Sequence, residues 1–438
     1  MTSRHEAYLR HANYYAGVVT KANGLYGSGQ QSSWNALSLF DLEWVNIRVG
    51  FLWAASQSAA NRAAAQLCID YLLETTLLPL RLNPHELLRW CEAGRASAAA
   101  LSDRNLEGCF LGNIGHTYHL LGDFERAVQF YGENLEIARE LGERRAQAVA
   151  LASIGAAYLE MGDARRTLDL CSESLKICRD IGDRRNEGIA LVSLGNAYEQ
   201  LKETDKAIEC YQLGGSIARG VGDKILEGRQ LNSLGVLYAG KTELAIGYCE
   251  QALVIARETG DLFGQGLALG SIGAMAKAAG DLPRAISAFT ERLAIAREIA
   301  DWIGESKAIA GLFSSYVATG QTDKLVALSK RRLAIAREIG DRQAEGAAFG
   351  DLGFAYSAVG DTERALAMID ERLAIAREIK DRNGESKGLF NKSKILWTLG
   401  DRSTAIVLAQ ASLAILRDID DPQAEEVSVQ ISVWLRLS

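Results

Sequence analysis

A repeat of 40 residues constrains the fold of this chain more than any other feature of its sequence. The pattern Leu-x-Ile-Ala/Cys-Arg begins at Leu135, Leu175, Leu253, Leu293, Leu333 and Leu373, with variants at Gly215 and Leu413. A second pattern, in which Gly precedes Tyr by three residues, recurs in phase at Gly115, Gly155, Gly195, Gly235 and Gly353. Self-similarity at such a period is typical of helical solenoids, in which each unit buries its apolar face against its neighbours. The sequence therefore predicts an all-α solenoid.

Each repeat contains two helical stretches with their own start and stop residues. In residues 143–182, the first stretch ends at Gly162, Asp163 can cap the second, and Gly182 ends it. Gly favours the left-handed conformation that closes a helix, and an Asp side chain accepts a hydrogen bond from a free N–H at a helix start. Because the connections are so short, the two helices of a unit are expected to pack antiparallel.

Composition limits the classes of function. Pro is scarce, at 4 residues, and 48% of the residues are hydrophobic, which suits a helical array. The net charge of −7 comes without the concentrated basic stripe of a nucleic-acid-binding protein. Seven cysteines without CxxC spacing indicate core residues in a reducing compartment. The sequence shows neither the apolar core of a signal peptide nor a membrane span, so we expect a cytoplasmic protein that binds neither nucleic acid nor membrane.

The repeats resemble the tetratricopeptide family in its 40-residue, Pins/LGN-like variant. The resemblance is carried by the Gly and Tyr of the first helix and by a Glu-Gly lead-in at Glu187, Glu227 and Glu345. It is also carried by the Ala that begins the second helix: Ala127, Ala207, Ala245, Ala285, Ala365 and Ala405. It implies a right-handed α-solenoid of antiparallel helix pairs, the tetratricopeptide superhelix. The chain is then expected to comprise an N-terminal helical segment (1–56), a degenerate repeat (57–102), eight repeats (103–420) and a capping helix (421–438).

The N-terminal segment resembles the helical region that precedes the repeats in STAND-type (NB-ARC/AP-ATPase) regulators. Residues 10–15 and 42–48 carry this second resemblance. The sequence contains no ATPase beside this segment. It is expected to be a free-standing relative, a split partner or a part of a longer protein, and these alternatives stay open.

One stretch matches a nucleotide-binding motif: residues 235–242 fit the P-loop pattern GxxxxGK[ST] letter for letter. A working P-loop follows a buried strand and opens a helix, so that backbone N–H groups surround the phosphates. Here Gly235 is the repeat glycine inside a helix, and its unit is shorter than the others by two residues. We interpret the match as a by-product of the shortened turn.

Other candidate chemistry has an ordinary structural interpretation. His116 and His119, with Cys109 two turns upstream, could present metal ligands on one helix face. Since no second cluster of His or Asp complements them, we interpret both as polar residues of an inner face and expect no metal and no cofactor. The recurring Arg292, Arg332 and Arg372, with the Arg/Glu pairs that follow them, are interpreted as surface residues, because exposed ion pairs contribute only about 0–1 kcal/mol. No catalytic arrangement is legible, so we expect no enzyme activity.

In the tetratricopeptide family the first helix of each unit lines a concave groove, and this implies a set of candidate partner-binding residues. The position three before the repeat glycine is mostly small, which leaves room for an inserted peptide or helix. The candidates in the first units are Asn113, His116, His119, Asn196 and Glu199. Those in the later units are Arg229, Asn232, Lys277, Lys307, Phe354, Lys387, Phe390, Lys394 and Trp397. Their cations would steer an anionic partner. We therefore predict a protein or peptide partner of acidic character, the alternative being that the lysines only confer solubility.

The Asn ladder with which Pins/LGN-like scaffolds hold a peptide backbone is broken in this chain. The position two before the repeat glycine reads Asn113, Ser153, Ser193, Ser233, Ser271, Gly311, Asp351 and Asn391. The partners of those scaffolds are therefore not implied. The leading hypothesis is a non-catalytic scaffold or adaptor, and the alternative is the sensor arm of a STAND-type signalling or defence switch. A nucleotide enzyme and a self-associating array are the remaining alternatives.

Overall fold

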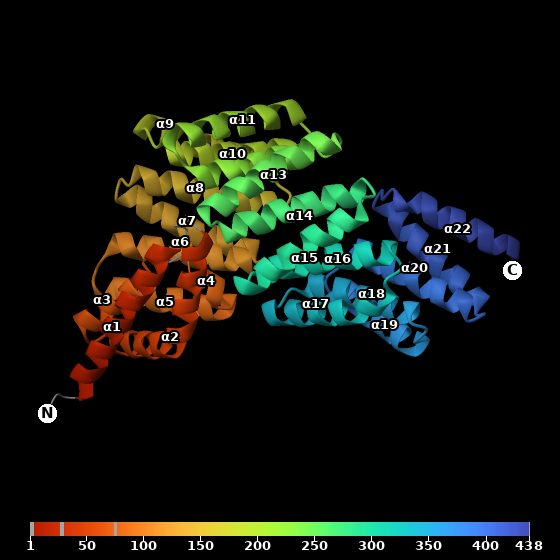
Figure 1. Ribbon diagram of the computed structural model, residues 1–438, viewed down its shortest axis with the longest axis horizontal. Coiled ribbons are helices and arrows are strands. Elements are labelled where there is room, and N and C mark those ends of the chain that lie inside the picture. Colours follow the sequence, from red (N-terminus) through yellow and green to blue (C-terminus); the bar gives the residue numbers. More distant parts are fainter. Residues whose placement is uncertain (1–3, 27–29, 74–76, 438) are drawn as a thin grey trace. The chain divides into compact units, whose positions relative to one another are not determined.

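The computed structural model describes residues 4–26, 30–73 and 77–437, and every regular element within them is a helix (Figure 1). The N-terminal helices are α1 (Arg4–Leu25), α2 (Gln30–Gln57), α3 (Arg62–Asp70), α4 (Leu78–Arg81) and α5 (Pro84–Ala100). The predicted all-α fold is confirmed. None of the helices in this described part of the chain is both long enough and apolar enough to cross a membrane.

Helix pairs follow one another along the rest of the chain, in the order that the 40-residue period predicts. The first four pairs are α6 (Arg104–Leu120) with α7 (Phe124–Glu140), α8 (Arg144–Glu160) with α9 (Ala164–Ile181), α10 (Arg184–Gln200) with α11 (Thr204–Val221), and α12 (Lys224–Leu237) with α13 (Thr242–Thr259). The next four are α14 (Leu262–Ala278) with α15 (Leu282–Glu298), α16 (Trp302–Ala318) with α17 (Leu325–Ile339), α18 (Arg342–Ala358) with α19 (Thr362–Glu378), and α20 (Arg382–Thr398) with α21 (Arg402–Asp418). A short 3₁₀ turn, Thr322–Lys324, precedes α17, and α22 (Gln423–Leu437) ends the described residues.

The chain forms two compact units, unit 1 and unit 2. The first comprises the residues up to 279 together with 294–301, and the second comprises 280–293 together with the residues from 302 on. The four-part division expected from the sequence stays a prediction, because helix bounds alone do not show where one domain ends and the next begins.

A left-handed residue closes the helices at intervals of 20 residues along most of the array. Gly occupies this position at 122, 142, 162, 182, 222, 260, 280, 320, 340, 360 and 400, with φ between 70° and 89°. Non-glycine residues take the same conformation where the period lacks Gly: Ser102, Lys202, Ala300, Lys380 and Asp420. The following residue is often an Asp whose side chain caps the next helix, as Asp163 does for α9. The predicted Gly-Asp punctuation is therefore present in the structure.

The repeat glycine of each first helix provides close contact between the two helices of a pair. A Cβ placed on Gly195 would lie 2.5 Å from Cε1 of Tyr211 in α11, and one on Gly235 would lie 2.4 Å from Sγ of Cys249 in α13. Tyr211 and Cys249 are both fully buried. The glycine is thus required because a side chain from the second helix fills the space where its Cβ would be.

The N-terminal helices of unit 1 build a core of their own. The rings of Phe51 in α2 and Trp90 in α5 stack with centroids 3.7 Å apart, and the Tyr71 hydroxyl donates to the carbonyl of Ala12 over 2.7 Å. They also reach later repeats of the same unit. Ser33 Oγ donates to the carbonyl of Gly260, at the end of α13, over 3.2 Å.

At the other end of the chain, α22 covers the apolar face of the last pair. Val427, Ile431 and Trp434 are buried and pack in one cluster with Ala405 and Leu416 of α21. This is the position that the expected capping helix should occupy. Without α22, the apolar face of α21 would meet water.

Candidate partner-binding site

The first candidates, Asn113, His116 and His119, lie on α6 in unit 1. Asn113 and His116 are exposed, while His119 is half-buried with its ring edge on Phe124 at a centroid distance of 5.2 Å. Partial desolvation, and then the neighbouring His119, lower the pKa of His116. The described residues contain no group of three or more His, Cys, Asp or Glu that could hold a metal ion.

Asn196 and Glu199, on α10, are held by a tyrosine of the adjoining helix. The hydroxyl of Tyr211 donates to Asn196 Oδ1 over 2.6 Å and lies 3.1 Å from Glu199 Oε2. Both side chains are only half-buried, so they keep surface for a ligand. Their orientation is fixed before any partner binds.

Arg229 and Asn232 of α12, and Lys277 of α14, complete the candidates of unit 1. Arg229 and Lys277 are exposed. Arg229 and Asn232 line a small cavity of about 10 Å³, and Asn232 Oδ1 is buried without a hydrogen-bond partner among the described residues. A buried acceptor in this state favours a donor from water or from a ligand.

Candidates of unit 2 gather around a cavity of about 280 Å³. It lies among α16, α18, α19, α20 and α22, and its lining includes Phe354, Lys387, Phe390 and Lys394. Phe354 is 42% exposed, and its ring meets Phe313 edge-on at 6.0 Å. Lys394 Nζ lies 4.6 Å from the ring centroid of Phe390. Desolvation lowers the pKa of Lys394, which favours an anionic partner beside it.

The remaining two candidates of unit 2 lie outside the lining of this cavity. Lys307, on α16, is exposed. Trp397 was predicted to contact a ligand, but its ring stacks on that of Trp434 of α22, with centroids 4.7 Å apart. The Arg402 guanidinium lies 5.2 Å from the centroid of the Trp397 ring. Both partners hold Trp397 within the packing of the capping helix. We therefore assign it to that core and no longer to ligand contact.

The interpretation of Arg332 and Arg372 as surface residues is wrong. The Arg332 side chain is 17% exposed and forms an ion pair with Asp351, while its Nε is buried without a hydrogen-bond partner in the described residues. Arg372, on α19, is partly buried, donates from Nε to the carbonyl of Gly384 over 3.2 Å and lines the cavity of unit 2. The 40-residue spacing of these arginines was visible in the sequence, but their direction was not, because the second helices also carry many exposed arginines.

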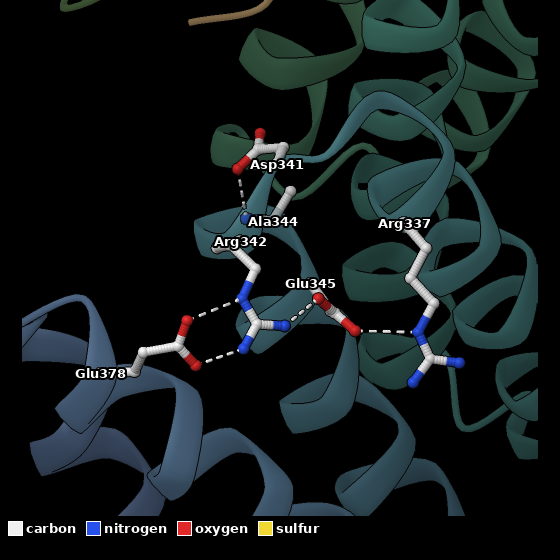
Figure 2. A network of polar contacts seen from close by, with 6 residues as sticks. All are labelled: Arg337, Asp341, Arg342, Ala344, Glu345 and Glu378. Atoms are coloured by element: carbon white, nitrogen blue, oxygen red, sulfur yellow. Dashed lines mark hydrogen bonds and ion pairs between the residues drawn. The ribbon is translucent and has the colours of Figure 1, made fainter. Parts of the chain in front are cut away.

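The arginines and glutamates at the repeat junctions form ion pairs, some of which cross from one repeat to the next. Glu345, at the start of α18, is 7% exposed and accepts from Arg337 Nε over 2.8 Å and from Arg342 Nη1 over 2.5 Å (Figure 2). Arg342 also pairs with Glu378 at the end of α19, the second helix of the same repeat. The Glu of the Glu-Gly lead-in is therefore a structural residue that joins α17 to α18, and Arg342 links this pair to α19.

The stretch that matches a P-loop has the wrong backbone for one. Residues 235–237 are the last of α12, and Thr242 begins α13 after a short turn. A helix precedes the turn in place of a buried strand. The repeat glycine Gly235 packs on Cys249, as described above, and is not part of a phosphate-binding loop.

Comparison with known proteins gives one family match and several structural similarities. Residues 106–166 and 153–214 match the tetratricopeptide repeat family. No curated protein sequence matches the chain significantly.

Solved structures similar to this one include a STAND protein with a tetratricopeptide repeat sensor from Pyrococcus horikoshii, at 19% identity and a TM-score of 0.55. The match covers 85% of this chain and 55% of that protein, so this chain spans about half the length of that protein. A Rap protein complexed with Competence and Sporulation Factor matches at 14% identity and a TM-score of 0.53, covering 83% of this chain and 99% of the other. The apo form of the quorum sensor NprR from B. thuringiensis matches at 13% identity and a TM-score of 0.50, covering 79% and 97%. At these identities the similarity establishes the fold.

Proposed function

We propose that this chain, which carries tetratricopeptide repeats at residues 106–214, is a non-catalytic scaffold or adaptor that binds a peptide or helix of a partner protein. The observation that carries the proposal is the cavity of unit 2. Its lining includes Phe313, Phe354 and Phe390, which come from three different first helices. Lys387 and Lys394 stand beside these rings. Phe354 is exposed and the other two rings are half-buried. Accessible aromatic side chains next to cations are an anchor for an apolar and acidic segment.

Two of the similar solved structures are described as a sensor and as a complex, which supports a binding role for this chain. The Rap protein was solved in complex with Competence and Sporulation Factor, and the STAND protein carries its repeats as a sensor. These folds are similar to this one over more than four-fifths of its length, at 83% and 85% coverage. A groove that takes a protein or peptide ligand is the use of the fold that we extend to this chain.

A peptide selection on the full chain tests the proposal. We expect a library of random displayed peptides to yield binders of the wild type that are enriched in Asp or Glu next to aromatic or aliphatic residues. These binders should lose at least tenfold in affinity for the Lys387→Glu/Lys394→Glu variant, because the reversed charges repel them.

The matched control reverses two lysines away from the cavity. Lys330 and Lys380 are exposed and do not line it. If the binders lose as much affinity for Lys330→Glu/Lys380→Glu as for Lys387→Glu/Lys394→Glu, they respond to net charge alone, and the assignment to this cavity is wrong. Selection of no binder at all would count against the scaffold role.

The second candidate function is the sensor arm of a STAND-type switch, and the match to the STAND protein over 55% of its length favours it. In that case the native protein includes, or acts with, an ATPase. Co-purification of the chain at its native expression level, followed by assay of ATPase activity in the complex with and without a selected peptide, tests this. An ATPase that is present and responds to the peptide supports the sensor arm, and a complex without one supports the free-standing scaffold.

A further inference from the structure

Arg372 reaches the cavity of unit 2 from a second helix, through a gap that glycines keep open. A Cβ placed on Gly350 of α18 would lie 2.0 Å from Arg372 Nη1, and one on Gly388 of α20 would lie 3.6 Å from its Cδ. The side chain of Arg372 thus passes between α18 and α20, held by its hydrogen bond to the carbonyl of Gly384. Its guanidinium is placed by the backbone of two neighbouring repeats.

Large cations are the exception at this position of the repeat. The equivalent residues, at 40-residue spacing with one shortened unit, are Asn134, Ser174, Gly214, Ala252, Arg292, Arg332, Arg372 and Ser412. Ser174, for example, is buried and donates to the carbonyl of Ala148 over 2.8 Å. Three consecutive repeats therefore have arginine where the others have a smaller residue.

Arg332 and Arg372 differ in how their charge is compensated. Asp351 pairs with Arg332. Among the described residues, Arg372 forms no ion pair. Desolvation lowers its pKa, and the charges of Asp351 and Asp381 offset this shift in part. A partly buried guanidinium without a paired anion is costly, and an anion supplied by a ligand would remove that cost.

Two cavities meet at this guanidinium. Arg372 and Lys387 line both the aromatic cavity and a second one, also of about 280 Å³, whose lining includes Gln343 and Asn383. In the aromatic cavity Glu426 lies near Lys394 and compensates its charge in part. Asp351, which pairs with Arg332, also lines the aromatic cavity, and Asp381 lines the second one. The two cations that line both cavities, Arg372 and Lys387, form no ion pair within the described residues.

We propose that Arg372 and Lys387 bind the side-chain carboxylate of an Asp or Glu in the middle of a bound peptide, with a neighbouring apolar side chain on Phe313, Phe354 and Phe390. This deepens the proposed function and rests on it. An internal acidic residue fits better than a chain end, because space continues on both sides of the guanidinium. A volume of about 280 Å³ lies at the small end of ligand cavities and suits one residue of a peptide.

The test uses short probes and the full chain, observed by saturation-transfer NMR. N-acetyl-Asp-Phe-amide is expected to bind with the strongest transfer to its phenyl ring, and N-acetyl-Asn-Phe-amide at least tenfold more weakly. N-acetyl-phenylalanine, whose only anion is a terminal carboxylate, is expected to bind more weakly than the Asp probe. Tighter binding of N-acetyl-phenylalanine would overturn the internal assignment, and displacement of the Asp probe by inorganic phosphate at equal concentration would overturn the assignment to a carboxylate.

Two variants remove the guanidinium in independent ways. Arg372→Gln deletes its charge, and Gly350→Ala keeps the charge but places a methyl group where Nη1 lies. Both are expected to weaken the Asp probe at least tenfold and to leave the weak binding of the Asn probe unchanged. Gly350→Ala should not unfold α18, since Ala310 and Ala152 stand at the equivalent positions of other repeats and Ala favours helix. Lys330→Gln, outside the cavity, is the control.

The outcomes separate this inference from the scaffold role. If library-selected peptides bind the wild type, Arg372→Gln and Gly350→Ala with equal affinity, the scaffold role is supported and the carboxylate site is contradicted. If Arg372→Gln fails to fold, Gly350→Ala and Lys387→Gln decide, and unchanged binding of the Asp probe to both overturns the proposal.

Discussion

At the scale of single residues, the backbone conformation between helices is set by position more than by residue type. The left-handed position recurs along the array, and Lys380 adopts it with φ of 58° at the end of α19, where other repeats have Gly. A side chain in this conformation costs about 1–2 kcal/mol, because Cβ crowds the following carbonyl oxygen. The surrounding helices hold Lys380 there in spite of that cost.

Lys380→Gly is therefore expected to stabilise the turn between α19 and α20 by about 0.5–1 kcal/mol, once the greater freedom of Gly in the unfolded chain is subtracted. Native-state hydrogen exchange of the amides in α19 and α20 measures the local opening free energy. The reverse change in the preceding turn, Gly360→Ala, should lower the opening free energy by about 1 kcal/mol, since Gly360 has φ of 81°. Equal exchange in all three proteins would show that the turn is not strained.

The candidate site could be predicted from the sequence only in part, and the reason lies in side-chain direction. Phe354, Lys387, Phe390 and Lys394 were named because the phase of the repeat places their Cβ atoms on one face of a first helix. Arg372 was missed because it belongs to a second helix and reaches the cavity only through the space left by Gly350. A long side chain can turn either toward or away from a groove, and periodicity does not distinguish the two.

At the scale of helices, the junction between repeats depends on one buried carboxylate. Burial raises the pKa of Glu345, but hydrogen bonds from Arg337 and Arg342 and their charges outweigh it, so the pKa lies below its usual range. The same arrangement recurs at Glu187, which pairs with Arg179 and Arg184. These ion pairs explain why Glu recurs at the start of the first helices.

Glu345→Gln is expected to destabilise α17, α18 and α19 by about 1–2 kcal/mol at pH 7, because the amide cannot accept from two arginines as strongly as a carboxylate. A carboxyl with a lowered pKa adds stability above its unfolded pKa of about 4.3 and loses that stability as the pH falls through the folded value. The difference between wild type and variant should therefore shrink below pH 4. Hydrogen exchange at pH 7, and thermal unfolding from pH 7 to pH 3, measure it; a difference that is constant with pH would contradict the role of the charge.

The helices themselves were the most predictable part of the molecule. The boundaries at Gly162, Asp163 and Gly182 follow from cap and turn chemistry, which acts over a few residues and is legible in sequence. The attachment of the N-terminal helices was not predictable. It joins Ser33 to Gly260, and no local signal or repeat connects residues so far apart.

At the scale of the whole molecule, stability in a repeat array is a sum of contacts between neighbours, and most contacts here obey that rule. Unit 1 departs from it. The N-terminal helices touch later repeats through Ser33 and also through Arg81, which donates from Nε and Nη2 to Asp41 over 2.7 and 3.0 Å and from Nη1 to the carbonyl of Glu298 over 2.5 Å. These long-range contacts couple α2 and α4 to the C-terminal ends of α13 and α15 within the unit. We expect unit 1 to open more cooperatively than a linear array of the same length.

Arg81 offers a test of this coupling, because its side chain is only 10% exposed while Asp41 is 54% exposed. Arg81→Met keeps the apolar stem and removes the donors, leaving the Glu298 carbonyl without this partner. We expect the opening free energy of α1–α4 to fall by about 1–2 kcal/mol, and that of the C-terminal end of α15 to fall with it, as measured by hydrogen exchange. Arg89→Met is the matched control, since Arg89 is exposed and forms no ion pair with the residues that the structure describes. If Arg81→Met loosens α4 but leaves α15 unchanged, the contact is local and the repeats of unit 1 are stabilised by their neighbours alone.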